Sequence, residues 1–214
     1  MRKLPVYLLI DISGSMMGDP IEAVKNGMQI MHSALRKDPY ALESAYISII
    51  TFADDVVQVV PLTEVASFRP PTISAGGGTS LGGALSKVYE CATREVQKST
   101  SSEKGDWKPL VFIMTDGVPT DDLTKGLNIF KQYKWGIVVA CDAGNGAGLS
   151  ALLQITQNVV SLDMTDSSSI QAYFKWVSSS ISASSQKVED ANFDDSSDLN
   201  ELPPPPPEIS LIIP

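Results

Sequence analysis

The sequence contains few of the side chains that build nucleophilic centres or soft-metal sites. Its 214 residues include one histidine, His32, and two cysteines, Cys91 and Cys141. Each cysteine lies in an apolar segment without a partner at the spacing of a metal motif, so we expect two buried free thiols rather than a disulfide. The composition therefore gives no support to a zinc site or to histidine-assisted hydrolysis.

Long apolar runs are missing as well. No stretch approaches the roughly 20 residues that a membrane span requires. The apolar run after Arg2 and Lys3 is short, ends at Asp11 and lacks the small-residue cleavage site of a signal peptide. We therefore expect a soluble, cytoplasmic protein that does not associate with a membrane.

Positive charge is scarce, and the formal net charge is −9. Seven acidic residues and one basic residue lie from Gln186 onward, so this end carries −6 and the rest of the chain carries −3. Nucleic-acid binding depends on clustered Lys and Arg, so we expect no nucleic-acid partner.

Apolar runs alternate with amphipathic segments over the first part of the chain. The runs at 4–10 and 110–114 are apolar almost throughout, as strands buried on both faces are. The runs at 45–52 and 56–60 are separated only by residues 53–55, which include Asp54 and Asp55. This link is too short for a crossover, so these runs should form an antiparallel hairpin. Further strands are expected at 136–141 and 159–162, and helices at 20–35, 81–96, 123–130, 149–155 and 168–181. The pattern predicts a doubly wound, Rossmann-like α/β fold: a mostly parallel six-stranded sheet with one antiparallel edge strand and helices on both faces.

The composition changes after Ser185. Acidic and Ser-rich sequence is followed by five prolines, Pro203 to Pro207, and by a short apolar ending. We therefore divide the chain into a domain at residues 1–185 and an acidic, proline-rich tail at residues 186–214. The apolar ending is unusual for a solvated tail, and both packing against the domain and docking elsewhere remain open.

Oxygen-bearing side chains follow two of the buried strands. Asp11, Ser13 and Ser15 come directly after the first strand, and their spacing of two would place them on one side of an extended chain. Asp116 follows the fourth strand, and Thr79 opens the helix after Gly76 to Gly78. Ligands of open α/β sheets bind beyond the carboxyl ends of the strands, where these residues should meet. Two carboxylates and three hydroxyls suit a hard divalent cation, with Mg²⁺ expected first and Mn²⁺ or Ca²⁺ as alternatives.

This combination resembles the von Willebrand factor A domain and its metal-ion-dependent adhesion site, over residues 1–182. The matching residues are Asp11, Ser13 and Ser15 in Asp-x-Ser-x-Ser, Thr79 in Gly-Thr-Ser-Leu, and Asp116 in Thr-Asp-Gly. The resemblance implies that the three hydroxyls ligate the metal directly, that the two aspartates act largely through water, and that a partner protein's Asp or Glu completes the coordination.

A closer resemblance is to the TerY-like proteins of tellurium-resistance gene clusters. The sequences that carry it are Leu-Pro-Val-Tyr-Leu-Leu near the start, Pro-Ile-Glu-Ala-Val-Lys-Asn-Gly at 20–27 and Lys-Gly-Asp-Trp-Lys-Pro-Leu-Val-Phe at 104–112. This resemblance implies a cytoplasmic bacterial A domain of a stress-response system, associated with a PP2C-like phosphatase and a protein kinase. We expect a monomer.

Catalytic alternatives have less support from the residues. A metal-dependent phosphohydrolase of Rossmann-like fold also starts with an aspartate after its first strand, but it needs a second aspartate two residues on, where this chain has Ser13. Ser15 lacks the Gly-x-Ser-x-Gly elbow of a serine hydrolase, and His32 lies mid-helix. We therefore expect no catalytic residues and a metal-dependent interaction module. A scaffold in which the metal only stabilises the fold is a third alternative.

Overall fold

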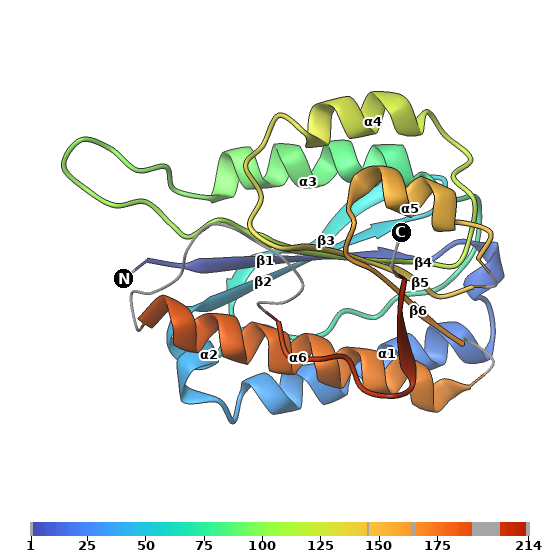
Figure 1. The fold of residues 1–214 in the computed structure, drawn as a ribbon, viewed down its shortest axis with the longest axis horizontal. Coiled ribbons are helices and arrows are strands. Elements are labelled where there is room, and N and C mark those ends of the chain that lie inside the picture. The colour runs from blue at the N-terminus through green and yellow to red at the C-terminus, as the bar shows by residue number, and fades with distance from the viewer. Residues whose placement is uncertain (1, 145, 164–165, 190–201, 213–214) are drawn as a thin grey trace.

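The computed structural model describes residues 2–144, 146–163, 166–189 and 202–212. In this part of the chain, strands form a seven-stranded sheet with the order β3-β2-β1-β4-β5-β6-β7 (Figure 1). The strands are β1 (Leu4–Asp11), β2 (Ala45–Phe52), β3 (Val56–Glu64), β4 (Leu110–Thr115), β5 (Val138–Asp142), β6 (Val159–Leu162) and β7 (Ile209–Ile212).

The five central strands are parallel, and both edge strands are antiparallel to their neighbours. β1 pairs with β2 and β4, and β5 pairs with β4 and β6, all in parallel. β3 pairs antiparallel with β2, as the short link predicts, and β7 pairs antiparallel with β6. Every residue of β1 and β4 is buried, which is why these strands are continuously apolar.

Helices cover both faces of the sheet, which confirms the predicted α/β class. They are α1 (Asp19–Leu35), α2 (Pro39–Ser44), α3 (Leu81–Glu95), α4 (Leu123–Phe130), α5 (Leu149–Ile155) and α6 (Ser167–Glu189). Figure 1 shows α3, α4 and α5 on one face and α1, α2 and α6 on the other. Alternate side chains of β1 supply the two cores, with Leu8 in the α1/α6 core and Leu9 in the α3/α4 core.

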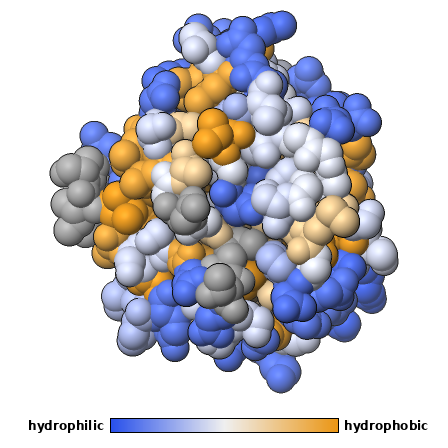
Figure 2. Space-filling view, turned by 90° about the vertical axis from the view of Figure 1, so that its right-hand side faces the viewer, coloured by the Kyte–Doolittle hydropathy of each residue, from blue (hydrophilic) through white to orange (hydrophobic). Residues whose placement is uncertain are grey.

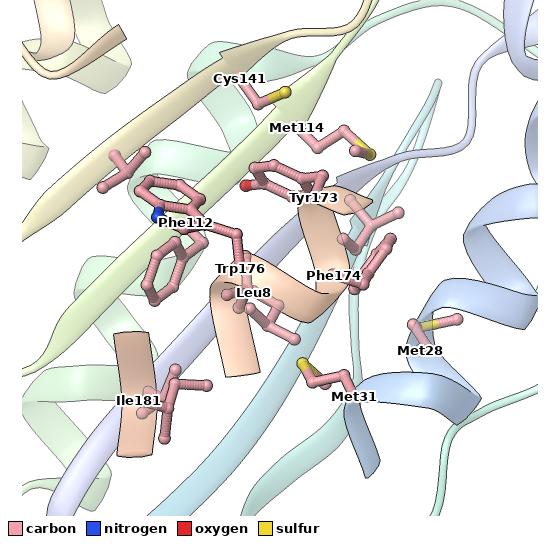
Figure 3. Packing of buried hydrophobic residues seen from close by; sticks show 14 of the residues in the cluster. Leu8, Met28, Met31, Phe112, Met114, Cys141, Tyr173, Phe174, Trp176 and Ile181 are labelled. Carbon is pink, nitrogen blue, oxygen red and sulfur yellow. The ribbon is translucent and has the colours of Figure 1, made fainter. Parts of the chain in front are cut away.

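The α1/α6 core is rich in aromatic and sulfur-containing side chains. Tyr173, Phe174 and Trp176 of α6 pack with Phe112 and Met28, which come from β4 and α1 (Figure 3). Gly27 of α1 lets the two helices approach, because a Cβ atom there would lie 2.2 Å from Cδ2 of Phe174. The helix pair and the sheet therefore form one continuous apolar interior.

The sheet has one strand more than the six that the sequence predicts. The additional strand, β7, comes from the short apolar ending, and Ile209 and Leu202 are buried in the α1/α6 core. The indole Nε1 of Trp176 also donates to the carbonyl of Pro203 at 2.8 Å. This ending therefore packs against the domain. The division at residue 185 stays a prediction, although α6 continues to Glu189; the acidic residues 190–201 lie outside the described residues.

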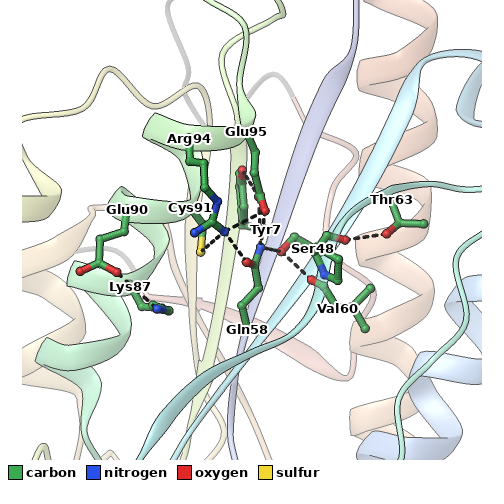
Figure 4. Close-up of polar contacts among 11 residues, drawn as sticks. Tyr7, Ser48, Gln58, Val60, Thr63, Lys87, Glu90, Cys91, Arg94 and Glu95 are labelled. Atoms are coloured by element: carbon green, nitrogen blue, oxygen red, sulfur yellow. Dashed lines mark hydrogen bonds and ion pairs between the residues drawn. The ribbon is translucent and has the colours of Figure 1, made fainter.

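A polar network joins α3 to the sheet on the opposite face (Figure 4). Glu95 accepts a hydrogen bond from the hydroxyl of Tyr7 at 3.1 Å and from Nε2 of Gln58 at 3.0 Å. Gln58 Nε2 also donates to Ser48, and Arg94 donates to Glu95 and to Gln58. The network thus ties β1, β2 and β3 to the last turn of α3.

Candidate metal centre

Asp11 is the last residue of β1, and its buried carboxylate is fixed by two hydrogen bonds. The backbone N–H of Ser13 donates to Oδ1 at 2.7 Å, and the Thr115 hydroxyl donates to Oδ2 at 2.5 Å. Thr115 ends the adjacent parallel strand β4. The carboxylate is therefore held between the ends of two neighbouring strands.

The hydroxyls of Ser13 and Ser15 link β1 to Asp116. The two Oγ atoms lie 3.0 Å apart, and Ser15 Oγ donates to Oδ1 of Asp116 at 2.7 Å. The extended spacing assumed from the sequence does not continue past Ser13, because residues Gly14–Met16 form a 3₁₀ turn. The tighter turn nevertheless brings both hydroxyls to one place.

The glycine-rich loop is bound to the same turn through backbone hydrogen bonds. Gly76 N–H donates to the carbonyl of Ile12 at 2.7 Å, and Gly14 N–H donates to the carbonyl of Gly77 at 2.9 Å. Gly77 has a φ of +87°, which favours glycine, and a Cβ atom there would collide with the Asp54 carboxylate. The loop therefore needs glycine both for its conformation and for its close contacts.

Thr79 is 5% exposed and is held by Thr120. Its N–H donates to the Thr120 hydroxyl, and its carbonyl accepts from the Thr120 N–H, both at 2.9 Å. A Cβ atom on Gly117, the residue after Asp116, would lie 3.2 Å from the Thr79 hydroxyl oxygen. The structure thus places Thr79 beside the Asp116 loop, while no hydrogen bond joins its hydroxyl to the other four candidates.

Negative charge accumulates where these segments meet. Burial raises the pKa of Asp11, and the charge of Asp116 raises it further, against the lowering effect of hydrogen bonds from Thr115 and Ser13. Burial and then Asp116 also raise the pKa of Asp142, the last residue of β5. Asp142 is 2% exposed, and its Oδ1 has no hydrogen-bond partner among the described residues. Within the same residues no Lys or Arg side chain donates to Asp11 or Asp116, which leaves their charges without a cationic neighbour.

The donor set fits a hard divalent cation and depends on the hydroxyls to do so. In the described ranges, no three or more His, Cys, Asp or Glu side chains are grouped closely enough to hold a metal by themselves. The hydrogen-bonded chain of Ser13, Ser15 and Asp116, next to the Asp11 carboxylate, offers only oxygen ligands. Oxygen ligands of this kind suit Mg²⁺, Mn²⁺ and Ca²⁺.

Several residues that shape the site were not recognised as such in the sequence. Asp54 accepts from the Gly78 N–H at 2.8 Å, and Asp121 accepts from Gly82 and Gly83 at the start of α3. Thr115 and Thr120 position Asp11 and Thr79. Only Thr115 carried a signal, because it belongs to Thr-Asp-Gly; the others lie in loops without periodicity.

A family model of the von Willebrand factor type A domain matches residues 6–176. The chain belongs to this family. No curated protein matches the chain significantly.

Several solved structures share the fold at low sequence identity. Proximal thread matrix protein 1 from the mussel byssus, solved with a zinc-occupied MIDAS motif, is 19% identical with a TM-score of 0.60, and the match covers 83% of this chain and 48% of that one. The open pilus adhesin SpaC of Lactobacillus rhamnosus GG is 15% identical with a TM-score of 0.67, covering 86% and 30%. An A domain of Catenulispora acidiphila is 14% identical with a TM-score of 0.64, covering 85% and 43%. The chain thus spans less than half the length of these structures.

The candidate site lies on the face of the domain where the carboxyl ends of the parallel strands meet. On this face, hydrophilic and hydrophobic surface lie side by side (Figure 2). Two apolar side chains next to the site loops are exposed, Met17 at 63% and Val118 at 59%. The surface around the candidate site therefore offers apolar contacts as well as charge.

Two other expectations concern the whole chain. Cys91 and Cys141 are both free and buried, as the sequence predicts. Among the described residues, no helix combines the length and apolarity that crossing a bilayer demands.

Proposed function

We propose that this A domain is a divalent-metal-dependent protein-interaction module. The observation that carries the proposal is the continuous set of oxygen donors at the ends of β1 and β4, in which Ser15 bonds both Ser13 and Asp116. Asp11, Ser13, Ser15, Thr79 and Asp116 would hold the metal, and Mg²⁺ is the expected ion, with Mn²⁺ and Ca²⁺ as alternatives. The bound cation would offer one open position to an Asp or Glu carboxylate of a partner protein.

The donor set explains why such a metal would need a partner. Two carboxylates balance the charge of a divalent ion, whereas three neutral hydroxyls donate little electron density to it. An anionic ligand from outside therefore gains more from this metal than from one surrounded by carboxylates. The mussel protein with a zinc-occupied MIDAS motif has the same fold, and a metal bound to that protein supports the plausibility of a metal here.

A binding role is proposed in preference to catalysis. His32 lies about 13 residues along α1 from its start at Asp19, which corresponds to about 20 Å at 1.5 Å per residue. Its ring contacts Phe68 at 5.5 Å between centroids, so it packs into the body of the domain. The metal-dependent phosphohydrolase would therefore lack a base of near-neutral pKa at the site. Hydrolysis of phosphate esters that stops in Asp11→Asn would favour that alternative.

The biological setting is proposed from the resemblance to TerY-like proteins. We propose a cytoplasmic, monomeric A domain of a tellurium-resistance or stress-response system, with a PP2C-like phosphatase and a protein kinase as candidate partners. Co-purification from cells in Mg²⁺, followed by identification of the recovered proteins, addresses this setting directly.

The metal dependence has a direct test. Mg²⁺ should raise the melting temperature of the wild-type chain and should leave Asp116→Ala unchanged, while both proteins stay folded in EDTA. Partners recovered in Mg²⁺ should be lost in EDTA and in Asp116→Ala. Glu43→Ala is the matched control, because Glu43 is an exposed carboxylate on α2, away from the strand ends (Figure 1). Equal recovery of the same partners in Mg²⁺ and EDTA would contradict the proposal.

A further inference from the structure

A hollow lies at the opposite end of the sheet from the candidate metal centre. It has a volume of about 390 Å³ and is lined by the last turns of α3, the segment that leads into β4 and the segment that follows α4. Figure 1 shows the link between α3 and β4 at the end of the sheet where β1 begins. Small-molecule sites in proteins are typically hollows of about 300–1,000 Å³ with apolar walls and a few polar groups.

Aromatic rings form the walls of this hollow. Tyr89 and Tyr133 line it, with ring centroids 6.3 Å apart and planes nearly perpendicular, and both are half-buried. Trp107 also lines it and is held by Arg2, whose Cζ lies 3.6 Å from the ring centroid. Trp135 packs against Tyr133 at 4.4 Å between centroids. Tyr89 and Tyr133 are therefore held by neighbouring aromatic rings and line the hollow without being fully buried.

The charge of the lining is opposite to that of the chain. Lys98, Lys108 and Lys134 line the hollow together with one acid, Asp106, in a chain of net charge −9. Both oxygens of Asp106 accept backbone N–H groups, from Lys3 at 2.9 Å and from Gln97 at 2.8 Å. In the described part of the chain, neither Lys98 nor Lys134 forms an ion pair with a carboxylate. The lining thus has ammonium groups to offer an anion.

A neighbouring hollow of about 420 Å³ shares part of this lining. The two share Lys108, Tyr133 and Lys134, and the second adds Lys131 and Trp135. Burial and the nearby charge of Asp106 raise the pKa of Tyr133, so its hydroxyl stays protonated at neutral pH and can donate a hydrogen bond. Aromatic residues and lysines therefore line both hollows.

We propose that the hollow of about 390 Å³ binds a nucleotide-type ligand, a flat aromatic ring that carries phosphate. The ring would lie against Tyr89 and Tyr133, which offer stacking and edge contacts to any base. The phosphate would lie near Lys98 and Lys134, because a doubly charged group can satisfy more than one ammonium ion. Two lysines that form no ion pair among the described residues favour phosphate over a single carboxylate. The site is separate from the metal centre and does not depend on the function proposed for it.

Titration with AMP tests the proposal, with adenosine and inorganic phosphate as comparison ligands. Calorimetry and quenching of Trp fluorescence should show saturable 1:1 binding of AMP in EDTA, so that the metal centre plays no part. Adenosine and phosphate should each bind at least about tenfold more weakly, since each lacks one of the two groups. The double variant Lys98→Ala/Lys134→Ala should lose about tenfold in affinity and keep its melting temperature, because both side chains are exposed. Lys175→Ala, an exposed lysine on α6, should bind AMP like the wild type.

Three outcomes would overturn the proposal. The first is the absence of saturable AMP binding at millimolar concentrations. The second is phosphate binding as tight as AMP binding, which would show that the rings contribute nothing. The third is unchanged AMP affinity in the lysine double variant. Tyr133→Phe removes the hydroxyl and keeps the ring, so it should retain most of the affinity for AMP if stacking on the ring dominates the binding.

Discussion

Adding one methyl group at Gly82 tests how the packing of α3 against α4 supports the candidate metal centre. A Cβ atom on Gly82 would lie 2.4 Å from the carbonyl oxygen of Asp122 and 3.0 Å from Cα of Leu123. These are backbone atoms at the start of α4, which cannot rotate away as a side chain can. The same two helices meet again at Gly126, where a Cβ atom would lie 2.1 Å from the Gly82 carbonyl oxygen. Gly82→Ala must therefore move α4 as a unit.

The expected change in the stability of Gly82→Ala follows from two opposing effects. Alanine favours a helix over glycine by about 1 kcal/mol, which would stabilise an unobstructed site. Forcing a methyl group into a packed interior typically costs about 1–3 kcal/mol, and the contact at 2.4 Å requires a backbone shift of roughly 0.6 Å. We place the cost at or above the upper end of this range, because the obstacle is backbone. We expect a net loss of about 2 kcal/mol, or roughly 4–8 °C in melting temperature for a chain of this size.

The shift should also reach the metal centre. Asp121 bonds the N–H groups of Gly82 and Gly83, and Thr120 bonds the backbone of Thr79. Moving α4 away from α3 would therefore move Thr79 relative to Asp116 and weaken Mg²⁺ binding several-fold.

Gly83→Ala is the matched control for this experiment. Its Cβ would meet a methyl group of Val56 at 2.9 Å, a side-chain atom that can move, so stability should change by less than about 1 kcal/mol. Urea denaturation and Mg²⁺ calorimetry on both variants give the two quantities. Wild-type stability and wild-type Mg²⁺ affinity in Gly82→Ala would refute the reasoning.

Three further predictions concern buried polar groups and the last strand. The raised pKa of Asp142 favours its protonated form in the folded state, so the stability that protonation contributes is lost as pH rises above about 4, the ordinary pKa of an Asp carboxyl. In EDTA, Asp142→Asn should flatten this loss in pH-dependent urea denaturation, and an unchanged slope would contradict it. Tyr7→Phe should lower the free energy of unfolding by about 1 kcal/mol, since Glu95 keeps its other donors. Glu95→Ala should lower it by about 2–3 kcal/mol, because the Tyr7 hydroxyl is then buried without a partner. Equal losses in thermal denaturation would be inconsistent with the network. Deleting residues 202–214 should lower the melting temperature, because β7 and the buried Leu202 are lost. The deletion should also expose the edge of β6 and promote association of the domain, which light scattering would detect. A monomer of unchanged stability would show that β7 is dispensable.

The regular part of the fold could be predicted because its signals are local. β1 and β4 are continuously apolar, and the alternation of strands with amphipathic helices leaves few topologies. β7 could not be predicted in the same way. The short run Ile209–Ile212 follows five prolines, and its pairing with β6 and the Trp176–Pro203 contact are long-range interactions without a local signature.

The candidate site also has a part that the sequence predicts and a part that depends on long-range contacts. Asp11, Ser13, Ser15 and Asp116 follow strands whose ends the parallel topology brings together, and the structure links three of them through side-chain hydrogen bonds. Thr79 lies in a loop whose course depends on Asp54 and Thr120. Neither residue belongs to a periodic segment, so their roles become visible only in three dimensions.

The backbone contacts imply that folding assembles this site without a metal. The turn after β1 and the glycine-rich loop are joined by two backbone hydrogen bonds, from Gly76 to Ile12 and from Gly14 to Gly77, and Thr79 is joined to Thr120 by two more contacts. The conformational entropy of ordering these loops is therefore lost when the domain folds, not when a cation binds. A binding cation would still have to lose part of its hydration shell. In return, it would relieve the repulsion between Asp116 and the buried carboxylates of Asp11 and Asp142. Metal affinity in this domain should thus depend on charge more than on loop flexibility, so that substitutions that neutralise Asp116 lower it far more than substitutions that loosen the 76–78 loop.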